Sequence, residues 1–239
     1  MNNLVHKLIL SEKIKDFLGS TTEYFSHDSA QTLSGNEQNR YRADQSVSKE
    51  NNSNQLHFFN CRVFLEIVRS QRQGRTCLPH NLGLSPKHQT QFKNALYLFL
   101  GKRSEDHQIY NDLFATQVED DDLRQSLLEM RLDEWQEIKD LLLLDATVID
   151  VSVEWMAEIV AAACMGGDHL WRDLGLPNRA MLGDLLLNNF RDLALKNTKD
   201  MKWKKFFYKQ LCEREGGYVC RAPSCEQCAA YQECFGPEE

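Results

Sequence analysis

Residues 151–167 read VSVEWMAEIVAAACMGG, and this stretch decides the class of fold. Its apolar residues recur at the three-to-four-residue spacing of an α-helix rather than at the alternating spacing of a strand. Two glycines close the stretch, as is typical of the end of a helix. The sequence therefore predicts a helix that buries one face, made of Val153, Met156, Ile159, Val160 and Ala163.

The same spacing continues toward the N-terminus. Apolar stripes begin at Phe58 and at Phe92, and a loop containing Pro79 and Pro86 separates them. A long helical stretch is expected to open at Asp120–Asp122, because acidic side chains suit the positive end of the helix dipole. Its buried face is predicted to consist of Leu123, Leu127, Met130, Ile138, Leu141 and Leu142.

Helices are also predicted on the C-terminal side. Asp168 is expected to cap a short helix, and Pro177 to occupy the first turn of the next one. Asn197 or Thr198 is expected to cap a last helix over residues 203–211. We find no alternating strand pattern, internal repeat or glycine-rich phosphate loop. The sequence therefore predicts an all-α fold, a helical bundle-like domain followed by a loop with four cysteines.

Composition divides the chain of 239 residues into two parts. Residues 1–18 are predicted to form a short amphipathic helix. Residues 19–56 are rich in Ser, Asn, Gln and charge, so they are predicted to be a disordered linker. Residues 57–239 are predicted to form the helical domain. No apolar run reaches the roughly 18 residues that span a bilayer, which predicts a cytoplasmic protein without a membrane partner.

The last cysteines carry the clearest chemical signal. They follow the pattern Cys220-x4-Cys225-x2-Cys228-x5-Cys234. Thiolates are soft ligands that suit iron–sulfur clusters or zinc, and eight cysteines in a cytoplasmic chain favour such chemistry over disulfides. Structural zinc sites usually have two close pairs of ligands, and only one close pair is present here. We therefore predict an iron–sulfur cluster on these four cysteines, with zinc as the alternative.

The other cysteines are interpreted separately. Small core hydrophobes are the default interpretation for Cys61, Cys77 and Cys164. Cys212 lies eight residues before the loop, so it is interpreted as a packing residue or as a spare ligand. His169 and Asp168 are also possible metal ligands by residue type, although an isolated histidine beside a capping aspartate is more often structural.

A basic stretch precedes the cysteine loop. Residues 196–221 contain eight basic and three acidic residues, although the whole chain has a net charge of −7. Such a run is often simply a solvated helix face. The alternative is a patch that attracts an oxyanion or an acidic partner. The lysines assigned to it are Lys202, Lys204, Lys205 and Lys209.

Three stretches together resemble the NifQ family of nitrogen-fixation proteins. They are residues 167–176 (GDHLWRDLGL), residues 197–213 (NTKDMKWKKFFYKQLCE) and the cysteine loop with the FGPEE that ends it. The resemblance implies an iron–sulfur protein that binds molybdenum and donates it for biosynthesis of the nitrogenase iron–molybdenum cofactor. It implies a [4Fe-4S]- or [3Fe-4S]-type cluster on Cys220, Cys225, Cys228 and Cys234.

The resemblance also implies partners and a role. The partners would be scaffold proteins of nitrogenase cofactor assembly, and molybdate or a molybdenum storage or donor source. The role would be that of a metal carrier rather than an enzyme, with no catalytic residues. Two alternatives stay open. One is a zinc-stabilised interaction module. The other is a helical iron–sulfur DNA-repair glycosylase, which the negative net charge disfavours because it opposes nucleic-acid binding.

Overall fold

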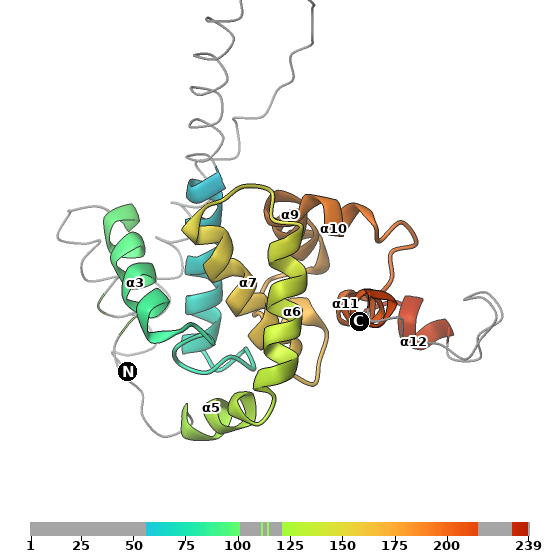
Figure 1. Ribbon diagram of the computed structural model, residues 1–239. Helices are drawn as coiled ribbons and strands as arrows, with labels where there is room; N and C mark the ends of the chain where they lie inside the picture. The colour runs from blue at the N-terminus through green and yellow to red at the C-terminus, as the bar shows by residue number, and fades with distance from the viewer. Residues whose placement is uncertain (1–55, 101–110, 112–113, 115–120, 215–230, 239) are drawn as a thin grey trace, which may run out of the picture. The chain divides into compact units, whose positions relative to one another are not determined.

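The computed structural model describes residues 56–100, 111, 114, 121–214 and 231–238 (Figure 1). The chain divides into two units, Met1–Asn54 and Gln55–Glu239, and the described residues lie in the second. Within these ranges the regular structure is helical and no strand occurs, which confirms the all-α prediction there. The helix predicted for residues 1–18, nearly all of the linker and residues 215–230 of the cysteine loop lie outside the described residues.

The centre of the fold is α7, Val151–Cys164. Twelve of its 14 residues are buried, so the helix is covered on almost every side rather than on one face. Asp150 caps its start, where the side chain accepts a hydrogen bond from the amide of Ser152 at 2.8 Å. Its last turn ends just before Gly166, as predicted. A helix that is apolar all round must be surrounded by other elements.

Helices from distant parts of the chain provide that cover. Residues 56–72 are helical, and α3, Pro86–Leu100, follows the loop after them. Phe64, Phe92 and Trp155 bring these two helices and α7 together, with ring centroids of Phe92 lying 4.9 Å from Phe64 and 5.8 Å from Trp155. On another side, α6, Leu132–Leu144, packs along α7 (Figure 1).

A buried amide pair fixes the position of a further helix, α9, Arg179–Asn189. Asn60 and Asn189 are fully buried, and each donates a side-chain hydrogen bond to the other, at 2.8 and 2.9 Å. Asn60 also donates to the hydroxyl of Ser152 on α7 at 3.0 Å. Because an unpaired buried amide is costly, this network favours a single register of the three helices.

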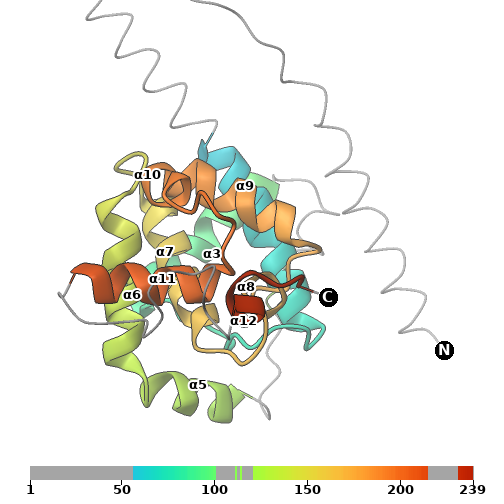
Figure 2. The same cartoon turned by 90° about the vertical axis from the view of Figure 1, so that its right-hand side faces the viewer.

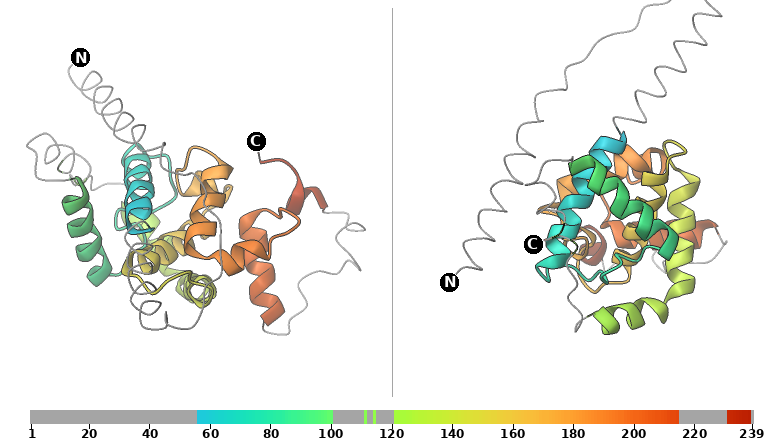
Figure 3. Two further views of the ribbon diagram at one scale, coloured as in Figure 1. Left: turned by 90° about the horizontal axis from the view of Figure 1, so that it is seen from above. Right: turned by 90° about the vertical axis from the view of Figure 1, so that its left-hand side faces the viewer.

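The remaining C-terminal elements are short apart from α11. They are α8, Leu170–Asp173; α10, Arg191–Leu195; α11, Trp203–Arg214; and α12, Tyr231–Phe235. Figure 2 shows α11 beside α6, against which it packs. Seen from above, α3 and the α11–α12 region lie on opposite sides of α7 (Figure 3). The buried residues of α11 are Trp203, Phe206, Phe207 and Leu211, as the apolar spacing predicted.

The long helix expected from Asp120–Asp122 to Leu142 is wrong. The chain forms α5, Asp121–Glu129, then turns at Met130 and Arg131 before α6 begins. After this break the apolar face of α6 no longer continues into α5. Ile138, Leu141 and Leu142 are buried as predicted. The side chains expected to extend that face are instead exposed, by 68% at Leu123, 53% at Leu127 and 82% at Met130.

Three predicted caps also differ. His169, not Asp168, is the capping residue of α8, and the Asp168 side chain accepts a hydrogen bond from the His169 amide. Asn178 caps α9, with its side chain accepting from the Met181 amide at 2.9 Å, so Pro177 precedes the helix. Asn197 closes the turn before α11 by bonding both backbone groups of Met201, at 2.8 Å each. Asp168 and Asn197 therefore form hydrogen bonds with backbone groups that lie outside the helices.

The buried and exposed leucines of this region give a matched test. Leu142 is fully buried, so Leu142→Ala should lower the free energy of unfolding by about 2–5 kcal/mol. Leu123→Ala removes the same atoms from an exposed site and should change it by about 0.5 kcal/mol or less. Urea denaturation followed by circular dichroism measures both. A similar loss in the two variants would show that Leu123 packs into the core as the sequence suggested.

Candidate functional site

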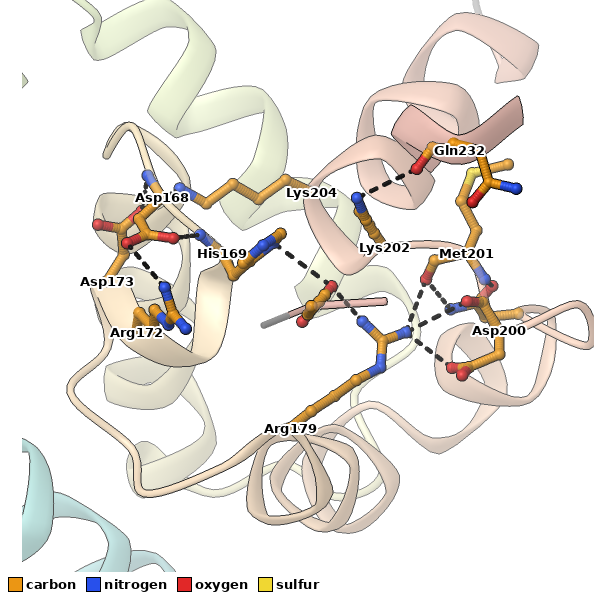
Figure 4. A network of polar contacts seen from close by, with 12 residues as sticks. Asp168, His169, Arg172, Asp173, Arg179, Asp200, Met201, Lys202, Lys204 and Gln232 are labelled. Carbon is orange, nitrogen blue, oxygen red and sulfur yellow. Dashed lines mark hydrogen bonds and ion pairs between the residues drawn. The ribbon is translucent and has the colours of Figure 1, made fainter. Parts of the chain in front are cut away.

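The C-terminal segment, residues 231–238, lies against the start of α11. The backbone amide of Lys202 donates to the carbonyl of Cys234 at 2.8 Å, and its ammonium group donates to the carbonyl of Gln232 at 3.3 Å (Figure 4). Both contacts use backbone groups of the segment, so they fix the path of the chain around Cys234. Cys234 is therefore held on the body of the protein, with its side chain half-buried.

An ion pair anchors the end of this segment. Glu238 has a side chain only 6% exposed, and its carboxylate contacts the guanidinium of Arg179 at the first turn of α9. The same guanidinium donates to the carboxylate of Asp200 at 2.7 Å and to the carbonyl of Met201 at 3.1 Å. His169 faces Glu238 from α8, with 3.8 Å between Nδ1 and Oε1 (Figure 4). A nearly buried carboxylate requires such a partner, because its charge is otherwise unsolvated.

The loop between α7 and α8 is held from two directions. Arg131 donates to the carbonyl of Met165 at 2.6 Å, and Lys204 donates to the carbonyl of Gly166 at 2.8 Å. Asp173 accepts from the amide of Asp168 at 3.0 Å and forms an ion pair with Lys204. Gly166 leaves room for this carboxylate, since a Cβ there would lie 2.4 Å from its Cγ. The loop therefore depends on side chains from α6, α8 and α11.

A second polar cluster joins α11 to the start of α6. Arg131 donates two hydrogen bonds of 2.7 Å to Glu134, which also accepts from the hydroxyl of Tyr208. The hydrogen bonds from Arg131 lower the pKa of Glu134, although partial burial opposes them. Burial and the bond to Glu134 raise the pKa of Tyr208. Glu134 is therefore an anion and Tyr208 a neutral donor at physiological pH.

The four lysines predicted to form a patch do not share one environment. Lys204 points inward, with a side chain 16% exposed, and its ammonium group is occupied by Asp173 and Gly166. Lys202 contacts the C-terminal segment, and Lys209 lies 3.3 Å from Glu213. Lys205 is exposed. The inward position of Lys204 removes it from any surface patch, because its charge neutralises Asp173.

The proposed ligands are only partly within the described residues. Cys220, Cys225 and Cys228 lie outside them, and Cys212 is half-buried on α11. In the described ranges, no three His, Cys, Asp or Glu side chains come together to hold a metal ion. Asp168 is exposed, and the hydrogen bond from the His169 amide lowers its pKa. The assignments of His169, Asp168 and Cys212 as ligands stay predictions.

The cysteines interpreted as core residues have the expected surroundings. Cys61 and Cys164 are buried, and Cys77 is half-buried with its thiol 3.7 Å from the carbonyl of Ala163. Burial raises the pKa of the Cys77 and Cys164 thiols to about 12. A thiol must lose its proton to act as a soft metal ligand, so these two are poor candidates for that role.

Sequence reasoning missed Arg179 and Glu238. The two residues are 59 positions apart. Glu238 belongs to the FGPEE stretch that follows Cys234, and Arg179 belongs to none of the three stretches quoted for the family resemblance. The only available signal was the acidic end of the chain after Cys234, which gives no indication of its partner.

Across the part of the chain that the structure describes, no helix combines the length and the apolar character that a membrane span requires.

These features define a class of protein: an all-helical domain that fixes a cysteine-bearing C-terminal segment onto its surface by backbone hydrogen bonds and an ion pair. The family model named NifQ matches residues 63–236, and the chain belongs to the NifQ family. This match includes the four cysteines of the loop. No solved structure shows a significant match to the chain.

Three proteins that carry the family name are similar to this chain over different shares of their length. Protein NifQ of Azotobacter vinelandii is 52% identical over 172 residues, which cover 72% of this chain and 86% of that protein. Protein NifQ of Rhodobacter capsulatus is 37% identical over 139 residues, covering 58% and 77%. The NifQ homolog of Sinorhizobium fredii strain NBRC 101917 / NGR234 is 46% identical over 102 residues, covering 43% and 44%.

The inward lysine of α11 can be tested against its exposed neighbour. Lys204→Met leaves the nearly buried Asp173 without its partner and should lower the free energy of unfolding by about 3 kcal/mol. Lys205→Met removes an equal charge from the exposed side of the same helix and should change it by no more than about 0.5 kcal/mol. Chemical denaturation at neutral pH measures both values. Equal stability of the two variants would contradict a structural role for Lys204.

Proposed function

We propose that the protein is an iron–sulfur accessory protein that binds molybdenum and donates it for biosynthesis of the nitrogenase iron–molybdenum cofactor. The observation that carries this proposal is the NifQ match over residues 63–236, which contains the whole four-cysteine pattern. Membership of this family supports a role in nitrogen fixation. The cluster is argued from the cysteine ligands themselves, and the molybdenum role is what the resemblance to the family implies.

The cysteine set suits a cluster. Cys220, Cys225, Cys228 and Cys234 would act as four thiolates, which are soft ligands for iron–sulfur clusters. Cys234, the member within the described residues, is half-buried on a segment whose backbone is fixed by Lys202. A fixed ligand at the end of the loop reduces the conformational entropy that the chain loses when a cluster binds. The cluster would be of the [4Fe-4S] or [3Fe-4S] type.

Molybdenum is the cargo in this proposal rather than a permanent part of the protein. The protein would receive it from molybdate or from a molybdenum storage or donor source. It would pass it to scaffold proteins of nitrogenase cofactor assembly. In this role the protein would be a metal carrier rather than an enzyme.

Metal analysis tests the proposal directly. Protein purified without exposure to air should be brown and contain iron and acid-labile sulfide, and it should take up molybdenum when supplied with molybdate and a reductant. Iron, sulfide, zinc and molybdenum are quantified on one sample. Stoichiometric zinc without sulfide would instead indicate the interaction module. Duplex DNA binding that weakens steeply with salt would indicate the glycosylase.

A cysteine pair provides the matched control. Cys228→Ala should lose the cluster and its molybdenum together, because the variant lacks one of four thiolates in one loop. Cys164→Ala removes a thiol that burial keeps protonated, so the iron and sulfide content should stay at the wild-type level. A full cluster in the Cys228→Ala protein would refute the ligand assignment.

A further inference from the structure

A small cavity lies beside the C-terminal segment. It has a volume of about 160 Å³ and is lined by residues of the α10–α11 connection, α11 and α12. Three of its lining residues are lysines, Lys196, Lys199 and Lys209. Among the described residues that line it, none is acidic. Cationic side chains without an acidic group in the wall attract an anion.

The countercharges of two of these lysines, Lys196 and Lys209, lie outside the cavity. Lys196 pairs with Asp145 at 2.7 Å, and Lys209 pairs with Glu213 at 3.3 Å, but neither carboxylate lines the wall. Both pairs are solvent-accessible, with lysine side chains 51% and 40% exposed. Ion pairs on a surface are worth little, so an ammonium group can turn from its carboxylate to a bound ligand at small cost.

Neutral groups complete the site. Thr198 and Gln210 supply polar side chains. The amide of Gln210 donates one hydrogen bond to Glu213 at 2.7 Å and has a second N–H that can donate to a ligand. Phe206, which is buried, and Phe235 form the apolar part of the wall. Phe235 follows Cys234 directly in the chain and belongs to the same short helix, α12. The cavity is therefore next to the segment that carries the last cysteine of the loop.

We propose that this cavity binds a small tetrahedral oxyanion. Its volume has room for several water molecules, and therefore for the four oxygens of one such ion. The lining residues include lysine, threonine and glutamine, whose side chains can donate hydrogen bonds. Only Lys209 belongs to the lysine patch predicted from the sequence. The structure instead adds Lys196 and Lys199, because the turn closed by Asn197 brings the chain before α11 back against it.

The identity of the ion rests on the proposed function. If the protein handles molybdenum, the ion is molybdate, held at the edge of the segment that contains Cys234 before the metal is transferred. Sulfate and phosphate have the same number of oxygens and similar shape. The shared chemistry is therefore an oxyanion site, and the relative affinities decide which ion it serves.

Equilibrium dialysis of the full chain, purified without air in chloride buffer, tests the proposal. Sulfate and molybdate are the probes, each measured separately. The double variant Lys199→Gln/Lys209→Gln should bind both ions about tenfold more weakly or worse, because it loses two charge-assisted hydrogen bonds. The control Lys87→Gln/Lys93→Gln makes the same change in net charge on α3, far along the chain from the cavity, and should bind like the wild type.

The outcomes separate this proposal from the proposed function. Oxyanion binding by protein that contains no iron would support the cavity and contradict the cluster. A brown protein in which the two double variants bind sulfate equally, or in which no ion binds at millimolar concentration, would overturn the cavity and leave the cluster. Molybdate bound more tightly than sulfate by wild type, with that preference lost in Lys199→Gln/Lys209→Gln, is the result expected when both hold.

Discussion

The burial of α7 is the constraint on which the rest of the structure depends. A helix with almost no exposed face cannot be stabilised by one neighbour, so residues 56–72, α3, α6 and α8 must all approach it. Its C-terminal end then leads into the loop at Met165 and Gly166. The carbonyls of that loop are bound by Arg131 and Lys204, which come from other parts of the chain.

Contacts made by α11 and α9 connect the core to the cysteine-bearing segment, residues 231–238. Lys204 belongs to α11, and the residue two positions before it, Lys202, holds the backbone of Cys234. Arg179 at the start of α9 holds Glu238 four residues further on. The path from α7 to Cys234 therefore passes through a few polar contacts, made by the side chains of Arg131 and Lys204 and by the backbone amide of Lys202. The described segment that contains Cys234, the last cysteine of the loop, is attached to this framework.

The sequence predicted the elements that rest on periodic apolar spacing. The burial of Ile159 on α7 and of Phe206 on α11 follows from that spacing alone, because a buried stripe leaves a regular pattern. The prediction of one long helix failed at Met130, where the apolar spacing continues although the helix is interrupted. The break is associated with tertiary contacts of Arg131, and no residue near it has the character of a helix breaker.

The sequence predicted the type of metal ligand at the candidate site but not which side chains meet there. The cysteine spacing indicates soft-metal ligation without any structure, since the ligands are close in sequence. The direction of Lys204 was not predictable, because its partner Asp173 lies 31 positions away. Arg179 and Glu238 were missed for the same reason. Lys196 and Lys199 entered the count of charges, but only the fold of the connection before α11 places them at a cavity with Lys209.

The central claim is that the protein fixes the segment around Cys234 in advance of metal binding, and hydrogen exchange of the metal-free full chain tests it most directly. Arg179→Gln should speed exchange of the amides in residues 231–238 by about tenfold or more, because it leaves the carboxylate of Glu238 unpaired. The control is Arg191→Gln, which changes an exposed arginine of α10 and should leave exchange of residues 231–238 as in the wild type. The amides of α7 should exchange at the wild-type rate in both variants. Equal exchange of residues 231–238 in the wild type and in Arg179→Gln would contradict the claim.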